Sequence, residues 1–437
     1  MKPHHHSRRT FLRRGAAAVT GAAGMYFPGI SRGALGPDGL KVALVGSGGR
    51  GTGAVSQFLT ASPESRLVAI ADAFGEKPQL ALKNLESRFA SQLDCPASRQ
   101  FVGLDAYKHA INEADLVLLT TPGAFRPAHF EAAVARGCHV FMEKPLGVDA
   151  PGIRRILAAS QTAKAKRLTC VAGFNRRFQA SYRDAYKRVQ EGDIGQIVSM
   201  EAMWRSSGIW QKERLPGQTE LQFQIMNWAN FVWLSGEMCL DMHVANLDVC
   251  NWFMGALPLS AKGTGLREDP LKVGEKFGDC LDHFEIEYKY PGGVKLASST
   301  YLIKGRPAAV NEVFIGTKGR AEALQYKPVI TDNNGSPVWR RREVKDEVNP
   351  YQQEHNELYA SIIKGKGLNN VEDSATSTLT AILGRTAAYT GREVTWDEVM
   401  NSKEEFCPPE LTWDSDPPTK PGKYGDYPMP ARARLGA

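Results

Sequence analysis

A glycine-rich turn placed directly between a strand and a helix constrains this chain more than any other sequence feature. Residues 41–45 form a short apolar run, and residues 46–51 read Gly-Ser-Gly-Gly-Arg-Gly. In this pattern Gly46 permits a tight turn, Gly48 lets a pyrophosphate approach the backbone, and Gly51 lets the helix pack close to the strand. The N–H groups at the helix start then face the phosphates. The pattern predicts an α/β fold with a doubly wound parallel sheet that binds a dinucleotide.

An acid at the end of the second predicted strand indicates which dinucleotide is bound. Residues 67–71 are apolar and lead into Asp72, at about the 20-residue distance from the glycines that a ribose-binding acid takes in such domains. A carboxylate there accepts hydrogen bonds from the adenosine ribose hydroxyls. The same charge repels a 2′-phosphate, so NAD(H) is favoured over NADP(H).

Two further predicted strands end in short motifs that border a ligand. Residues 114–120 lead to Thr-Pro at 121–122, and residues 138–142 lead to Glu-Lys-Pro at 143–145. Ligands of a doubly wound sheet lie beyond the carboxyl ends of its strands. Both motifs are therefore expected beside the nicotinamide half of the cofactor.

Composition and charge exclude several other classes of protein. Hydrophobic residues make up 42% of the chain, which is normal for a globular protein. The sequence contains no run of about eighteen apolar residues, so no integral membrane domain is expected. Of the net charge of +7, six positive charges lie in residues 1–32, which leaves 7 − 6 = +1 for the rest; no nucleic-acid partner is expected. The seven scattered cysteines predict neither a metal site nor a disulfide framework.

The basic leader resembles a twin-arginine export signal. Residues 7–12 read Ser-Arg-Arg-Thr-Phe-Leu and precede a Gly/Ala-rich stretch at 15–25. Such signals carry proteins that are already folded. We therefore expect residues 1–36 to be an export leader and the mature protein to be periplasmic or extracytoplasmic. The alternative is an ordinary basic tail beside a short helix.

Taken together, these motifs resemble the Gfo/Idh/MocA family, named for glucose–fructose oxidoreductase and inositol dehydrogenase. Residues 173–178 (Gly-Phe-Asn-Arg-Arg-Phe) and 316–319 (Gly-Thr-Lys-Gly) are similar to later segments of that family. The resemblance covers roughly residues 40–400. The residues expected to bind NAD are Gly46, Gly48, Gly49, Arg50, Gly51, Asp72, Thr121, Pro122, His129, Glu143 and Lys144.

The resemblance also implies how the chain is divided. It implies a Rossmann domain over residues 37–165 and, over residues 166–400, an α/β domain with a large, open, mostly antiparallel sheet. Helices near 350–395 would pack back on the first domain, and one sheet face often serves a homo-oligomer, a dimer or tetramer. Residues 401–437 are rich in proline and are expected to form an extended arm that wraps a neighbouring subunit or lies free.

The same resemblance indicates the catalytic residues. Lys144 would be the principal acid/base, because an ammonium can stabilise the alkoxide that develops on a substrate hydroxyl. The family's Asp-x-x-x-His-x-x-Asp pattern places Asp241 on the first acid and Ala245 where histidine is usual. Either His243 is the base, or Lys144 acts with Asp241 alone, or the usual dehydrogenation is impaired. We predict Lys144, Asp241 and His243 as catalytic; Asp248 either makes an internal salt bridge or touches substrate.

Aromatic and polar side chains suggest a carbohydrate or polyol substrate. Five of the eight tryptophans lie within residues 204–252, and flat aromatic faces beside polar groups suit sugar rings. The predicted substrate-binding residues are Arg176, Arg177, Trp204 and Trp228, with the alternative that one arginine pairs with an acid.

The expected function is therefore that of an exported NAD-dependent oxidoreductase acting on a sugar, polyol or related hydroxy compound. Because free NAD is scarce outside the cytoplasm, export implies tight cofactor retention. Two alternatives stay open: an NAD-dependent, redox-neutral glycoside hydrolase or lyase that works through transient C3 oxidation, and a nucleotide-binding protein without turnover, in which Ala245 marks the loss of activity.

Overall fold

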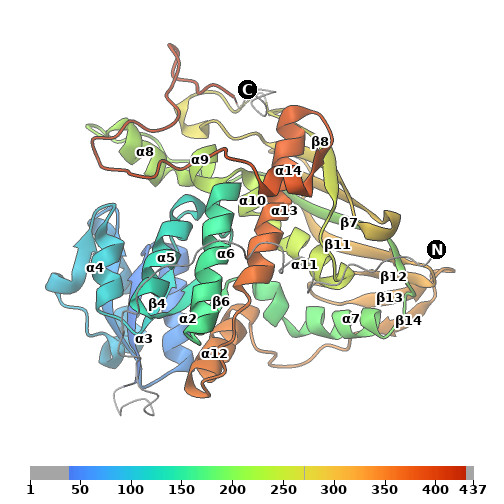
Figure 1. The fold of residues 1–437 in the computed structure, drawn as a ribbon, viewed down its shortest axis with the longest axis horizontal. Helices are drawn as coiled ribbons and strands as arrows, with labels where there is room; N and C mark the ends of the chain where they lie inside the picture. Colours follow the sequence, from blue (N-terminus) through green and yellow to red (C-terminus); the bar gives the residue numbers. More distant parts are fainter. Residues whose placement is uncertain (1–38, 270, 430–437) are drawn as a thin grey trace, which may run out of the picture. The chain divides into compact units, whose positions relative to one another are not determined.

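The structure, a computed structural model, describes residues 39–269 and 271–429 (Figure 1). The predicted export leader, residues 1–36, lies outside the described residues. Within the described ranges, no helix combines the length and apolar character needed to cross a membrane. The same ranges contain no cluster of three or more His, Cys, Asp or Glu side chains arranged to hold a metal ion.

The first half of the described chain forms a six-stranded parallel sheet with the order β3-β2-β1-β4-β5-β6. Its strands are β1 (Lys41–Val45), β2 (Arg66–Asp72), β3 (Gln100–Val102), β4 (Leu116–Leu119), β5 (His139–Met142) and β6 (Cys170–Ala172). The helices along it are α2 (Gly49–Ala61), α3 (Glu76–Phe89), α4 (Ala106–Asn112), α5 (Arg126–Arg136) and α6 (Ala150–Ala165). The strand order reverses between β1 and β4, and this switch point is where such sheets bind ligands.

The central strands are apolar along their whole length because both of their faces are covered. Every residue of β4 is buried, as is every residue of β1 except Lys41. A strand with one solvated face would alternate instead. Strand β6 pairs with β5, so the first sheet extends to Ala172, beyond the predicted domain end at residue 165.

The second half of the chain forms a nine-stranded sheet with the order β14-β13-β12-β11-β7-β10-β9-β8-β15. Its strands are β7 (Ile197–Ser206), β8 (Ser260–Leu266), β9 (His283–Lys289), β10 (Lys295–Leu302), β11 (Ala309–Gly316), β12 (Gly319–Glu322), β13 (Val329–Asp332), β14 (Pro337–Arg340) and β15 (Val394–Thr395). Only β7 and β10 are parallel neighbours; the other pairs are antiparallel. The predicted fold class, a Rossmann-type domain followed by a mostly antiparallel sheet, is confirmed.

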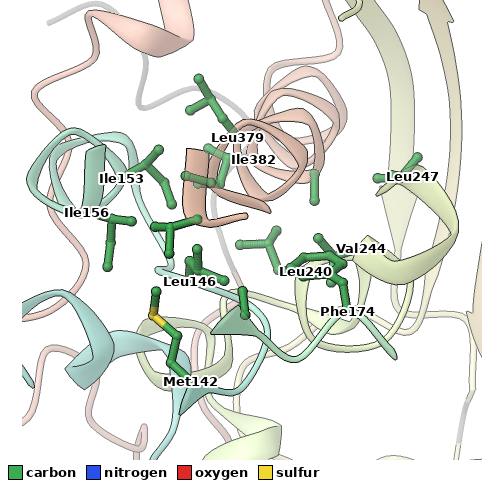
Figure 2. Packing of buried hydrophobic residues seen from close by; sticks show 14 of the residues in the cluster. Met142, Leu146, Ile153, Ile156, Phe174, Leu240, Val244, Leu247, Leu379 and Ile382 are labelled. Carbon is green, nitrogen blue, oxygen red and sulfur yellow. The ribbon is translucent and has the colours of Figure 1, made fainter. Parts of the chain in front are cut away.

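Helices connect the two sheets through one continuous apolar core. The remaining helices are α7 (Ala180–Gln190), α8 (Glu220–Met226), α9 (Val232–Ser235), α10 (Met238–Asp241), α11 (Val244–Met254), α12 (Pro350–Ile363), α13 (Val371–Thr390) and α14 (Trp396–Met400). Helix α12 packs on α2, while α13 contacts both α6 and the second sheet. Figure 2 shows Leu379 and Ile382 of α13 between Ile153 of α6 and Leu240 of α10. The α6–α13 contact fixes the first sheet relative to the second.

The C-terminal arm is extended, but it lies against its own chain. Residues 401–429 contain no helix or strand. The Phe406 N–H donates to Asp149 Oδ2 at 2.9 Å, and Tyr427 is buried with its ring 4.9 Å from that of Phe231. The expectation that the arm lies free is therefore wrong for its described part, because aromatic side chains within it are buried by the protein itself.

Candidate active site

A cavity of about 500 Å³ opens at the switch point of the first sheet. It begins at the glycine turn, passes the end of β2 and reaches the loop after β4. Its walls include most of the residues predicted to bind a cofactor: Gly46, Gly48, Gly49, Arg50, Gly51, Asp72, Thr121, Pro122 and His129. Glu143 and Lys144 are not among the lining residues and stand beyond it at the end of β5.

The glycine turn leaves room for a phosphate. Gly46 has φ +92°, and a Cβ there would lie 2.8 Å from the backbone nitrogen of Thr121. A Cβ on Gly51 would overlap the Gly46 carbonyl oxygen, whereas a Cβ on Gly48 would meet no described heavy atom within 4 Å. Helix α2 begins here, and none of the described side chains caps its N-terminus. The open space and the uncapped N–H groups fit the pyrophosphate of a dinucleotide.

Asp72, at the end of β2, holds the glycine turn in place through hydrogen bonds to Ser47. Its Oδ2 accepts hydrogen bonds from the Ser47 backbone N–H at 2.7 Å and from the Ser47 hydroxyl at 3.0 Å, and its Oδ1 accepts from Phe74 N–H at 3.1 Å. Burial raises the pKa of this carboxyl, while these hydrogen bonds act in the opposite direction. The carboxylate therefore stands in the cavity wall where ribose hydroxyls are bound in such folds.

Arg126 ties the two strand-end loops together. This buried side chain, at the start of α5, donates hydrogen bonds to the carbonyl oxygens of Thr121 and Pro145. Burial lowers its pKa to about 10. His129, one turn later, has its Nδ1 3.2 Å from Thr121 Oγ1. Burial and the charge of Arg126 lower the pKa of His129 to about 3, so this imidazole is neutral and helps to shape the cavity. Arg126 was not predicted from the sequence, although its place four residues after Pro122 of the Thr-Pro motif was a signal.

Arg50 joins the glycine turn to the Glu-Lys-Pro motif. Its Nε donates to Glu143 Oε1, its Nη2 lies 3.5 Å from Glu354 Oε1, and its guanidinium sits 4.6 Å above the Tyr351 ring. Burial, and then the charge of Glu143, raise the pKa of Glu354 well above its usual range. Glu143, the neighbour of Lys144, is therefore the closer partner of Arg50. Glu354 and Tyr351 lie on α12, far along the chain, and neither was predicted from the sequence.

Lys144 and Asp241 form a pair between the two halves of the chain. The Lys144 amine donates to the backbone carbonyl of Asp241 and lies 3.6 Å from its Oδ1. The lysine side chain is 25% exposed and the aspartate 8%. The Lys144–Pro145 peptide bond is cis. An ammonium with protons to donate, beside a carboxylate that can take one up, is the pairing that acid–base chemistry on a hydroxyl requires.

His243 occupies a different environment. It immediately precedes α11, and its Nε2 lies 2.8 Å from Ser298 Oγ on β10. The side chain is 1% exposed, and burial together with the charge of Arg176 lowers its pKa to about 3. This is the environment of a structural histidine bonded to the sheet, so the predicted catalytic role of His243 is not retained. Ala245 cannot carry a proton, so Lys144 and Asp241 remain the candidates for that task among the predicted catalytic residues.

Both arginines predicted to bind substrate are paired with acids of the chain. Arg176 is buried and donates to Glu312. Arg177 makes two hydrogen bonds to Asp248, at 2.7 and 2.8 Å. A buried guanidinium needs a partner of opposite charge, because desolvation of an unpaired charge costs several kcal/mol. We therefore assign both arginines to the scaffold, in place of the predicted substrate contacts, and Asp248 to the internal salt bridge that was one of its two alternatives.

Removal of Asp248 should show this scaffold role in stability. We expect Asp248→Ala to lower the free energy of unfolding by about 3 kcal/mol, because it leaves the largely buried Arg177 charge without its main partner. Glu131→Ala, which breaks the exposed pair with Arg155, should cost less than about 1 kcal/mol. Urea unfolding of both variants measures the difference. An equal loss of unfolding free energy in the two variants would contradict the assignment of Arg177 to the scaffold.

Aromatic side chains of the second half form another wall of the cavity. Trp228 lines it beside Trp210, with ring centroids 5.9 Å apart and planes at 68°. Trp204 lies on β7 opposite Thr300 of β10. Side chains alternate along a strand, so Trp204 shares the face of Ala202, which is buried against the helices. Trp228 thus lines the cavity, whereas Trp204 lies on the sheet face that the helices cover.

Comparison with known proteins agrees with this arrangement. Residues 40–174 match the family model GFO_IDH_MocA, described as an oxidoreductase family with an NAD-binding Rossmann fold. The scyllo-inositol 2-dehydrogenase (NAD(+)) of Bacillus subtilis is 24% identical over 64% of this chain and 74% of its own length. The inositol 2-dehydrogenase of Acidiphilium cryptum is 31% identical over 39% of this chain and 47% of its own.

Solved structures share the fold over most of the chain. Aldose-aldose oxidoreductase from Caulobacter crescentus superposes with a TM-score of 0.65 at 20% identity, covering 82% of this chain and 99% of that one. Scyllo-inositol dehydrogenase from Lactobacillus casei, solved with NAD(H) and scyllo-inositol, gives a TM-score of 0.61 at 20% identity with the same coverage. At this level of identity the likeness establishes the architecture.

Proposed function

We propose that this chain, an NAD-dependent oxidoreductase of the Gfo/Idh/MocA family, interconverts a hydroxyl and a carbonyl group on a polyol or related carbohydrate. The observation that carries the proposal is the Lys144–Asp241 pair at the end of β5, where the neighbouring Glu143 is bonded to Arg50 of the glycine turn. NAD, when bound, supplies the acceptor or donor of the hydride. The inositol dehydrogenases among the relatives support a cyclic polyol as the substrate class.

Side chains of the protein have the other roles in the proposed reaction. In the oxidation direction, the Lys144 ammonium donates a hydrogen bond to the substrate oxygen and stabilises the negative charge that develops on it. The Asp241 carboxylate, 3.6 Å from that amine, takes up one of the amine's protons, and the amine takes up the hydroxyl proton in its place. Arg50 holds Glu143 and so fixes the backbone that carries Lys144. Trp228 and Trp210 offer flat apolar faces to the C–H side of a ring.

Asp72 should control cofactor affinity. We expect Asp72→Ser to weaken NAD binding about tenfold, because the ribose loses a charged acceptor and the Ser47 N–H loses its partner. Quenching or enhancement of bound NADH fluorescence gives the dissociation constant. The matched control is Asp94→Ser, at an exposed acid that pairs with Arg99, and it should leave the affinity unchanged. Unaltered binding in Asp72→Ser would contradict the assigned ribose position.

One experiment tests the reaction itself. The purified protein is examined for co-purified nucleotide and is then given inositol isomers, other polyols, free sugars and aryl glycosides. Absorbance at the nicotinamide band and release of the aglycone are followed together. We expect absorbance to change with a polyol or sugar and no aglycone to appear. Aglycone release without a net absorbance change would overturn the proposal in favour of redox-neutral glycoside hydrolysis, which the dehydrogenase relatives do not favour.

We further propose that the protein is exported by the twin-arginine route to the periplasm or another extracytoplasmic space. The support is the Arg8-Arg9 pair followed by Phe-Leu and a Gly/Ala-rich stretch. Residues 1–36 fused to a reporter that is active only after export should direct it out of the cytoplasm, and changing both arginines to lysine should stop this. Export of the double variant at the original level would contradict the proposal.

We also propose a homo-oligomer, a dimer or tetramer, as the family resemblance implies, with the face of the nine-stranded sheet that lies opposite α11 at the interface. Light scattering coupled to size exclusion measures the mass in solution. A monomer at all accessible concentrations would contradict it.

A further inference from the structure

The dinucleotide cavity has a wall that the nucleotide-binding motifs do not supply. Five of its lining residues belong to the second half of the chain: Trp210, Lys212, Ile225, Met226 and Trp228. They lie in and around α8, opposite the glycine turn. We name residues 210–228 the cover segment.

The cover segment is held together by its own polar contacts. Asn227 Oδ1 accepts from the Lys212 N–H at 3.1 Å, and Asn230 Nδ2 donates to the Trp210 carbonyl at 3.1 Å. Thr219 caps α8 with a reciprocal bond from Gln222. These bonds join the irregular first part of the segment to α8 and to the residues that follow this helix, so the segment would move as one piece.

The C-terminal arm contacts the cover segment from outside. The Thr419 carbonyl accepts from Gln224 Nε2 at 2.8 Å, and the Tyr427 hydroxyl donates to Glu220. Tyr427 is 3% exposed, although it lies in a segment without helix or strand. Figure 1 shows the arm passing α8 and α9. The arm therefore buries specific side chains on the cover segment.

The same arm contacts the opposite wall of the cavity. Trp413 lies with its ring 5.8 Å from that of Phe74, and Phe74 lines the cavity just after Asp72. Arg385 sits 4.3 Å above the Phe406 ring. One hydrophobic cluster includes cavity-lining residues of both walls, among them Phe74, Leu104, Phe125, Ile225 and Trp228, together with Phe406, Leu411, Trp413 and Tyr427 of the arm. The arm thus bridges the Rossmann domain and the cover segment.

We propose that the arm is a latch that holds the cover segment over the bound dinucleotide, so that NAD stays on the protein through successive turnovers. This inference rests on the proposed function, since it requires that the cavity bind NAD. To let the cofactor leave, the cover segment must separate from the Rossmann domain, and the arm must then give up its contacts at Trp413 or at Tyr427. Local opening of this kind is governed by the contacts that must break.

The test measures release of NADH, which needs no substrate. The protein is loaded with NADH and mixed with excess NAD, and the decay of NADH fluorescence gives the dissociation rate. We expect Trp413→Ala and Tyr427→Ala each to accelerate release at least about tenfold. Tyr424→Ala, at an 86% exposed side chain of the same arm, is the control and should release NADH at the wild-type rate.

A second measurement uses the unaltered protein, in case a variant fails to fold. Hydrogen exchange is compared with and without NADH. The latch predicts that amides of residues 405–428 and of α8 both become slower to exchange when NADH binds. The latch proposal is wrong if NADH release rates in the folded variants equal that of the wild type, or if NADH binding does not slow hydrogen exchange in the arm. The proposed function stands in either case. If the wild type binds no nucleotide at all, the proposed function itself fails.

Discussion

Lys144→Met is expected to lower kcat by about 10²–10⁴-fold, because it removes both the charge that stabilises the substrate oxygen and the group that passes on its proton. NAD affinity should change little, since Lys144 stands outside the cavity wall and its amine is bonded to Asp241. Steady-state kinetics with the polyol identified in the panel, together with NADH titration, separates the two effects.

The control for this change is Lys164→Met, which removes an equally long side chain from an exposed pair with Glu372. Its kcat should match the wild type. A Lys144→Met enzyme that keeps a third or more of its kcat would show that another group performs the acid–base step. A loss of NAD binding as large as the loss of kcat would show that Lys144 serves the cofactor instead.

Gly48→Val is expected to weaken NAD binding by about 100-fold or more without destabilising the protein. A Cβ at this position meets no described heavy atom within 4 Å, and the backbone there (φ −68°, ψ −176°) is open to any residue. The free energy of unfolding should stay within about 1 kcal/mol of the wild type. The side chain would instead occupy the space that the pyrophosphate needs.

Gly51→Ala is the matched comparison for this prediction. Its Cβ would overlap the Gly46 carbonyl oxygen, so it should lower stability in the absence of any nucleotide. Urea unfolding and NADH titration are measured on both variants. A Gly48→Val protein that binds NADH as the wild type does would mean that the dinucleotide does not lie on this turn.

The parts of the site that could be predicted from sequence are those built by neighbouring residues. The glycine turn, Asp72 and the two strand-end motifs each need only one strand and the residues that follow it. Their geometry is local, and parallel strands bring their carboxyl ends to one edge of the sheet. For this reason the wall formed by the glycine turn, Asp72 and Thr121-Pro122 could be predicted before the fold was known.

The parts that could not be predicted depend on partners far apart in the chain. Arg176 looked available for substrate, but its acid, Glu312, comes from a strand of the second sheet. Arg50 likewise gains Glu354 from α12. A charged residue in a sequence does not reveal whether its counter-ion will be a ligand or a distant side chain. Burial decides this, and burial is a property of the complete fold.

The role of His243 was also not predictable from the sequence, because it depends on the structure around one helix. Its role depended on where α11 begins, which sequence leaves uncertain by a few residues. The helix does begin beside it, at Val244, yet the imidazole bonds to Ser298 of the sheet. The prediction for the C-terminal arm was incomplete for a related reason. Its proline content correctly predicted an extended chain, but it gave no indication of the surface that buries Tyr427.

The most direct test of the account is a crystal structure of the protein with NAD bound. The account predicts that the diphosphate lies against the backbone of residues 46–51, that the adenosine ribose meets Asp72, and that the nicotinamide ring lies beside Thr121 and the Lys144–Asp241 pair. A nicotinamide ring at the Phe74 end of the cavity, or a diphosphate away from the glycine turn, would contradict it.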